Sequence, residues 1–163
     1  MIIPKYDEGF CPQGYIVAKD GEYEGLLVRP SFLLLSADER KGICNGIGAA
    51  SGLSKHFPNT IWGLDCKAAG DVHDYDYHIG GGAGDKLIAD QVFLHNCRTI
   101  IRKRGYWFLR WPRDDRARAY YIALRLCGSS HFNYTNGEND SDSINLEFTE
   151  GETSETSDME GEA

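Results

Sequence analysis

The sequence has few cysteines and no long apolar run, and both absences limit what the protein can be. Its 163 residues contain five cysteines, none in CxxC spacing, so we expect reduced thiols rather than a disulfide framework. No segment reaches the roughly 18 apolar residues of a membrane-spanning helix, which predicts no transmembrane segment. Residues 1–10 also lack the layout of a signal peptide. We therefore expect a protein that stays inside a cell or a particle.

Basic residues are missing from the C-terminal end of the chain. Residues 136–163 hold ten Asp or Glu and no Lys or Arg, so residues 1–135 carry 17 basic against 15 acidic side chains. The net charge of −8 therefore comes from this end, where aromatic and aliphatic residues also become sparse. We predict one globular domain over residues 1–135 and a disordered acidic tail over residues 136–163, which keeps the chain solvated.

Arginines and aromatic residues are concentrated between residues 98 and 125. The region contains Tyr106, Trp107 and Trp111 together with Arg98, Arg102, Lys103, Arg104, Arg110, Arg113, Arg116, Arg118 and Arg125. Such a region could meet nucleic acid or anionic lipid headgroups. We favour the simpler interpretation of a solvated helix face with arginines lying along apolar surface, and we expect no nucleic-acid partner.

The order of the patterns predicts an α+β fold in which a small N-terminal antiparallel sheet precedes three helices. Runs at 15–18 and 24–28 flank a hairpin turn signal, and residues 31–35 favour a third strand. Trp62 is expected in the core. The glycines of residues 80–84 allow the first two helices to be antiparallel core helices. The expected helices are 64–78, about 85–104, and from Asp114 or Asp115 to about Cys127.

The first expected helix carries a histidine on the face that should be buried. Helical periodicity places His73 and Tyr77 on this face with Cys66, Ala69 and Gly70. In the next helix, Asp90 falls in the apolar stripe of Leu87, Leu94, Cys97 and Ile101. Burying a carboxylate without a partner costs several kcal/mol, so Asp90 needs one. His73, on the preceding antiparallel helix, is the nearest candidate.

An inward histidine with two nearby aspartates supplies the parts needed to activate water. Asp90 would hold the tautomer of His73, and Tyr77 would hydrogen-bond Asp90. Asp74 and backbone carbonyls of the glycine-rich segment 42–52 would hold a cation. The same residues also suit a structural network that only fixes helix packing, and the sequence leaves both interpretations open.

Four segments resemble, in order and spacing, a family of uncharacterised proteins of tailed phages and prophages. The resemblance covers roughly residues 23–128 and implies a phage origin without an established activity. The matching segments are Ala50–Ser51, His73–Tyr77, Ala89–Leu94 and Tyr121–Gly128.

A second resemblance is to secreted and viral phospholipases A2. Their glycine-rich calcium loop, His-Asp-x-x-Tyr helix and later helical Asp are similar to residues 44–48, residues 73–77 and Asp90. The chain departs from these enzymes because it lacks their disulfide pattern. It departs from the phage family at Asn45, where an acidic residue is usual.

The phospholipase resemblance implies a general base, His73, that Asp90 orients. It also implies calcium as the cofactor. The implied calcium ligands are Asp74 and the carbonyl groups of Gly46 and Gly48. We therefore expect a phage-encoded protein that hydrolyses an ester, for example of a phospholipid, through a metal-held water, with His73, Asp90 and Tyr77 in the catalytic site. The rival hypothesis is a non-enzymatic virion component or effector that binds another phage protein or a host protein, in which these residues form a core network.

Overall fold

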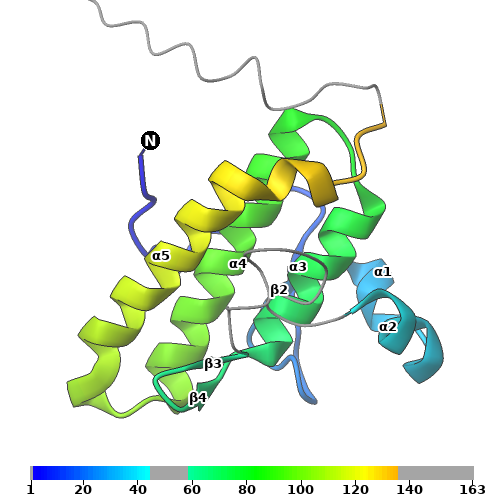
Figure 1. Cartoon of the computed structure of the whole chain (residues 1–163). Coiled ribbons are helices and arrows are strands. Elements are labelled where there is room, and N and C mark those ends of the chain that lie inside the picture. The colour runs from blue at the N-terminus through cyan, green and yellow to red at the C-terminus, as the bar shows by residue number, and fades with distance from the viewer. Residues whose placement is uncertain (1, 45–58, 136–163) are drawn as a thin grey trace, which may run out of the picture.

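Three long helices form the main layer of the protein (Figure 1). The structure is a computed structural model that describes residues 2–44 and 59–135. The helices are α3 (Lys67–Ile79), α4 (Ala83–Arg104) and α5 (Arg110–Cys127). Helix α4 packs against both of the others and runs antiparallel to each. This arrangement confirms the predicted α+β class with two antiparallel core helices, whereas the predicted tail, residues 136–163, lies outside the described residues.

The glycines between α3 and α4 turn the chain back on itself, as the sequence predicts. Gly80 ends α3 with a φ of 73°, a left-handed conformation that glycine adopts without strain. A Cβ at this position would also overlap the carbonyl oxygen of Asn133. Helix α4 begins after Gly82, whose N–H donates to the Asp85 carboxylate at 3.0 Å. The short turn therefore lays α4 along α3.

The N-terminal hairpin forms as predicted and is fastened to α4 by one side chain. Its strands are β1 (Ile16–Val17) and β2 (Leu27–Val28), paired antiparallel. Asn96, which is fully buried on α4, accepts from the Leu27 N–H at 2.8 Å and donates to the Leu27 carbonyl oxygen at 2.9 Å. The side-chain amide of Asn96 thus makes the two hydrogen bonds with Leu27 that a neighbouring strand would otherwise make.

The predicted third strand at residues 31–35 is wrong, because this segment is helical. The chain forms α1 (Pro30–Leu33) and then α2 (Ala37–Ile43). Proline favours the first turn of a helix, and the run that follows it does not alternate between apolar and polar residues. Ser36 and Glu39 form a capping box at the start of α2, with the Ser36 N–H donating to Glu39 at 2.8 Å.

A second hairpin, which the sequence analysis did not predict, precedes α3. Its strands β3 (Thr60–Ile61) and β4 (Leu64–Asp65) pair antiparallel, so the expected helix begins only at Lys67. Trp62 and Gly63 make the turn with positive φ angles of 48° and 72°. Trp62 is 63% exposed, and its predicted place in the core is therefore wrong.

Helix α5 begins earlier than predicted. A 3-10 turn, η2 (Trp107–Leu109), leads directly into Arg110, and a second one, η3 (Gly128–His131), follows the helix. Asp114 does not cap α5, because its carboxylate binds Arg98 at 2.6 Å and Arg118 at 2.9 Å. None of the helices in the two described segments combines the length and apolar composition that crossing a bilayer requires.

Candidate functional site

The carboxylate of Asp90 is the centre of a buried polar cluster that joins the three long helices. Asp90 is completely buried on α4. Its Oδ1 accepts from the Tyr77 hydroxyl at 2.7 Å and lies 3.1 Å from His73 Nε2, both on α3. Its Oδ2 accepts from Lys86 Nζ at 3.2 Å and from Arg125 Nη1, on α5, at 3.1 Å. The structure therefore brings together the predicted residues His73, Tyr77 and Asp90 and adds two cations.

The surroundings of Asp90 keep its carboxylate ionised. Burial by itself raises the pKa of a carboxyl group, because it disfavours the charged form. At Asp90 this effect is outweighed by the hydrogen bond of His73, the charge of Lys86 and the hydrogen bond of Tyr77, which together lower the pKa below its usual value. The site therefore holds a negative charge beside the imidazole at neutral pH.

His73 is held in one orientation by its neighbours. The ring lies against Tyr77, with centroids 4.0 Å apart, and meets Phe93 edge-on at 5.2 Å. Because ionised Asp90 can only accept, Nε2 carries the proton in the contact between them. Nδ1 makes no hydrogen bond to any residue in the described segments. A neutral His73 thus keeps a lone pair on Nδ1.

Tyr77 acts as a donor at this site. Burial, together with the charge and the hydrogen bond of Asp90, raises the pKa of its hydroxyl, so the proton stays on oxygen. Gly128, at the end of α5, lies directly against this hydroxyl, because a Cβ there would be 2.6 Å from the Tyr77 oxygen. The close approach of α5 therefore depends on glycine at this position.

Sequence reasoning missed Lys86 and Arg125 as members of the site. Lys86 is fully buried and also donates to the Leu124 carbonyl oxygen at 3.3 Å. Its position four residues before Asp90 was a usable signal, because residues at i and i+4 share a helix face. Arg125 falls in the segment Tyr121–Gly128 that resembles the phage family, but no role was assigned to it.

The predicted metal ligands are only partly described. Asp74 is half-buried on α3, whereas Gly46 and Gly48 lie outside the described residues. Cys44, where the described chain leaves α2, donates its thiol to the Asp71 carbonyl oxygen at 3.2 Å. Burial and the charges of Asp71 and Asp74 raise the pKa of that thiol to about 12. The chain therefore enters residues 45–58 beside the part of α3 that carries Asp74. Within the described segments, no group of three His, Cys, Asp or Glu is placed to hold a metal.

Two further carboxylates of α3 are buried outside this cluster. Asp71 accepts from the Tyr23 hydroxyl at 3.3 Å and pairs with Lys67. Asp76 pairs with Arg29 at 2.9 Å, and burial raises its pKa to about 6. Tyr23 and Arg29 belong to the N-terminal part of the chain, so these contacts fasten that part to α3.

Comparison of the chain with protein-family models, with curated proteins and with solved structures finds no match. The phage and phospholipase resemblances therefore stay predictions.

Proposed function

We propose that this chain is a phage-encoded hydrolase that cleaves the ester of a phospholipid, with His73 as general base. The observation that carries the proposal is the contact of His73 Nε2 with ionised Asp90 at 3.1 Å. It leaves the Nδ1 lone pair to take a proton from a water molecule that attacks the ester carbonyl. The same nitrogen can then return the proton to the departing alcohol.

Asp90 and Tyr77 are positioning residues in this proposal, because they act through His73. Asp90 fixes the tautomer, and its charge stabilises the imidazolium that forms when Nδ1 takes the proton. Tyr77 holds Asp90 by its 2.7 Å hydrogen bond and supports the ring of His73 from one side. Replacing Tyr77 by Phe should therefore lower the rate less than replacing His73.

Calcium enters the proposal through the phospholipase resemblance. Asp74 and the carbonyl groups of Gly46 and Gly48 would hold it, and bound there it would polarise the ester carbonyl. The position of Asp74 beside Cys44 is compatible with this ligand set, since residues 45–58 follow directly. A calcium titration of the chain and of Asp74→Asn tests it, with loss of the calcium response in the variant as the expected result.

The decisive experiment measures hydrolysis of a fluorogenic phospholipid by His73→Ala and by His78→Ala. Loss of a general base lowers the rate by about 10²–10⁴-fold, so we expect His73→Ala to lose activity. His78 is exposed on the same helix and should be replaceable without effect. Circular dichroism would establish that both variants fold. A folded His73→Ala variant with full activity would contradict the proposal.

The alternative function is that of a non-enzymatic phage protein, either a virion component or an effector that binds a host factor. The observation in its favour is that Lys86 and Arg125 both bind Asp90, although proton transfer through His73 needs neither. A cluster of this kind would serve to fix the packing of the three helices against one another. Under this alternative, the chain hydrolyses no phospholipid with or without calcium, and His73→Ala lowers the urea midpoint of unfolding.

A further inference from the structure

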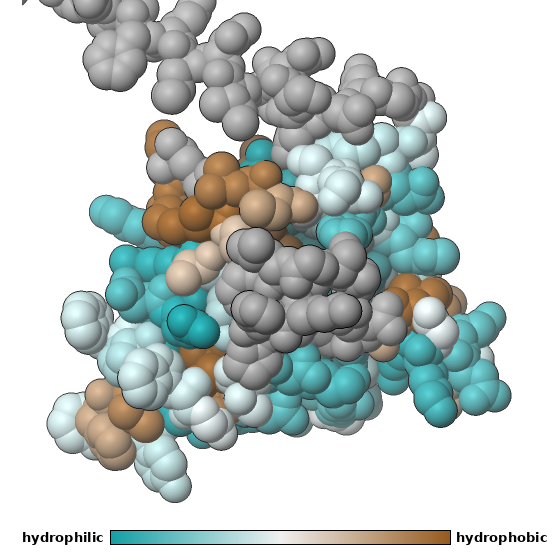
Figure 2. All heavy atoms as spheres, viewed as in Figure 1, coloured by the Kyte–Doolittle hydropathy of each residue, from teal (hydrophilic) through white to brown (hydrophobic). Residues whose placement is uncertain are grey.

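Five large aromatic side chains project into solvent at the end of the molecule where α4 connects to α5. Each is between 61% and 80% exposed, and together we call them the aromatic tip: Trp62, Tyr106, Trp107, Phe108 and Trp111. They come from the β3–β4 turn, from η2 with the residue before it, and from the start of α5. Figure 2 shows pale and brown side chains projecting at this end, at the lower left. The tip includes all three tryptophans of the chain.

Trp62 reaches the tip at a conformational cost. Its φ of 48° lies in the left-handed region, where a bulky residue is strained and where Asn or Gly is usual in a two-residue hairpin turn. Burial of the indole does not offset this strain, since the side chain is 63% exposed. The Trp62 carbonyl oxygen accepts from Arg113 of α5 at 2.9 Å, which ties the turn to that helix. The strained turn thus holds an indole in solvent, and such outliers point to a role in binding.

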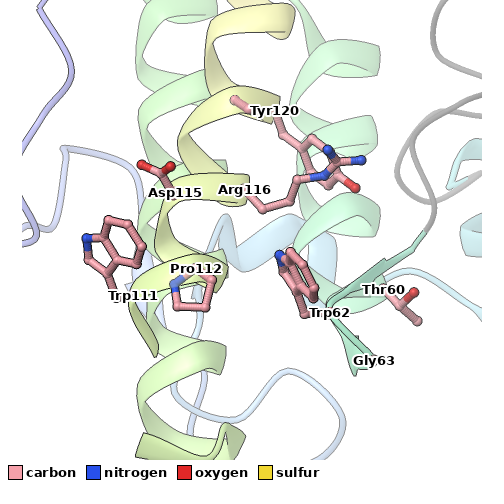
Figure 3. A pocket seen from close by; sticks show the side chains of 9 residues that line it. Thr60, Trp62, Gly63, Trp111, Pro112, Asp115, Arg116 and Tyr120 are labelled. Carbon is pink, nitrogen blue, oxygen red and sulfur yellow. The ribbon is translucent and has the colours of Figure 1, made fainter. Parts of the chain in front are cut away.

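Trp62 and Trp111 stand on opposite sides of a groove between the second hairpin and α5 (Figure 3). The groove has a volume of about 610 Å³, and Pro112, Asp115 and Tyr120 contribute to its lining. In this view the side chain of Arg116 extends away from Trp111 to the ring of Tyr120, above Trp62, with its guanidinium 5.2 Å from the centre of the Tyr120 ring. The groove therefore offers a cation flanked by aromatic walls.

The surroundings of the aromatic tip are strongly basic. Residues 98–118 contain eight Lys or Arg and two Asp, and one of those two, Asp114, is paired with Arg98 and Arg118. Basic side chains exposed near the tip are Arg102, Lys103, Arg104, Arg110 and Arg116. An anionic partner is therefore favoured over a neutral or cationic one.

We infer that the aromatic tip docks on the surface of an anionic phospholipid bilayer. Indole and phenol rings favour the boundary between headgroups and acyl chains, because they combine an apolar body with a polar group. Arginine and lysine next to them gain from the negative surface potential of anionic lipids. Single-stranded nucleic acid would use the same charges and can stack its bases on exposed rings, but it offers no continuous apolar layer that buries all five rings, Phe108 among them, together. The combination of apolar and basic groups therefore favours the bilayer.

The aromatic tip is separate from the polar cluster around Asp90. Gly105, at the tip end of α4, is fifteen residues from Asp90, which corresponds to roughly 22 Å along a helix. Docking therefore does not depend on the proposed ester hydrolysis. Vesicle binding by the His73→Ala variant should equal that of the original chain, which keeps the two proposals separately testable.

Tryptophan fluorescence and cosedimentation with vesicles test the docking. The full chain is mixed with vesicles of phosphatidylglycerol and phosphatidylcholine in equal parts, or of phosphatidylcholine alone. We expect a blue shift of emission and cosedimentation with the first vesicles, both weakened by high salt. The Trp107→Ser/Trp111→Ser double variant should bind about tenfold more weakly or worse. Lys103→Gln and Arg110→Gln should each weaken binding about fivefold.

The matched control is Leu34→Ser/Leu126→Ser, which removes two exposed apolar side chains elsewhere and should bind as the original chain does. The inference is overturned if the full chain does not bind the anionic vesicles or if the control loses as much binding as the tryptophan variant. Displacement by millimolar glycerol phosphate would overturn it in favour of a site for free phosphate. Tighter binding to a single-stranded oligonucleotide, or a lipid-free dimer that the tryptophan variant abolishes, would also overturn it.

Discussion

Asp90 and Asp76 are both buried carboxylates, yet their surroundings give them opposite acid–base behaviour. Asp90 has four donors, two of them cationic, and its pKa is lowered. Asp76 has one cationic partner, Arg29, and burial raises its pKa to about 6. Both side chains are buried, so the number of charged donors, and not the depth of burial, accounts for the opposite directions of the two pKa shifts.

The opposite pKa shifts also give Asp90 and Asp76 different roles in the protein. Asp90, whose lowered pKa keeps it charged at neutral pH, fixes the tautomer of a neutral His73. Asp76 instead changes its charge near pH 6 and contacts the N-terminal part of the chain through Arg29. One carboxylate is therefore suited to support a proton acceptor, and the other makes stability depend on pH.

Replacing each carboxylate by the amide of equal shape should give the largest contrast. Asp90→Asn leaves Lys86 and Arg125 without a counter-charge at a buried site, and we expect it to lower the free energy of unfolding by about 3–5 kcal/mol. Asp76→Asn should cost far less at pH 7, because it removes a buried charge and Arg29 is partly exposed. Urea unfolding of both variants measures the difference. Equal losses would show that the donors around Asp90 do not matter.

The pH dependence of stability should separate the two sites next. The folded-state pKa of Asp76 lies above its ordinary value of 3.8, so its stability contribution is fully present below about pH 4 and is lost as the pH rises to about 6. The loss amounts to about 3 kcal/mol. Asp76→Asn should abolish this slope in unfolding measured between pH 4 and 7.

Asp90 should act in the opposite direction. Its lowered pKa makes its stabilisation complete above pH 3.8 and lost as the pH falls further below that value. The Asp76→Asn variant should therefore still unfold in acid. If the free energy of unfolding of the Asp76→Asn variant still falls between pH 4 and 6, the pH dependence in that range belongs to another group.

Gly128→Ala should disturb the Asp90 cluster and leave the Asp76 pair unchanged. The new Cβ would lie 2.6 Å from the Tyr77 oxygen, and we expect a loss of about 2 kcal/mol from overpacking. Gly84→Ala, in α4 with no heavy atom within 4 Å of its Cβ, is the matched control and should be neutral or stabilising. Thermal unfolding distinguishes them, and similar behaviour of the two variants would contradict the close approach of α5.

Lys86→Met should have a smaller effect than Asp90→Asn or Gly128→Ala. The methionine keeps most of the length of the side chain, and Asp90 retains Arg125, Tyr77 and His73 as donors. We expect a loss of about 1 kcal/mol, the net value of one hydrogen bond. A loss as large as that of Asp90→Asn, measured in the same urea titration, would mean that Lys86 alone keeps the carboxylate charged.

The central helices and the His73–Asp90 contact were predictable from sequence, because both follow from local periodicity. Residues at i, i+3 and i+4 place His73 and Tyr77 on the buried face of α3 and Asp90 on that of α4, and the glycines between them make the helices antiparallel. The contribution of Arg125 depends on how α5 packs beside α4. Nothing in the local pattern sets that register.

The wrong predictions have two sources, which are local helix signals that were given too little weight and contacts between residues far apart in the sequence. The apolar run at residues 31–35 suits a strand as well as a helix, and the capping box of the following helix and Pro30 decide between them. Trp62 looks like a core residue by composition. It lies instead in the β3–β4 turn, whose backbone is tied to α5 by buried Arg113 while the indole points into solvent. Asp114 is a residue type that often caps helices, but its carboxylate forms an ion pair with Arg98 instead.

The amide of Asn96 has a consequence for how molecules of this protein behave at high concentration. An unpaired strand edge is a template for another chain, which can add its own backbone to it. At Leu27 both backbone groups are already occupied by Asn96, so β2 has no free N–H or carbonyl there to recruit a second molecule. In the folded chain this edge is also buried, so another molecule could add to β2 at Leu27 only after the Asn96 contacts had opened.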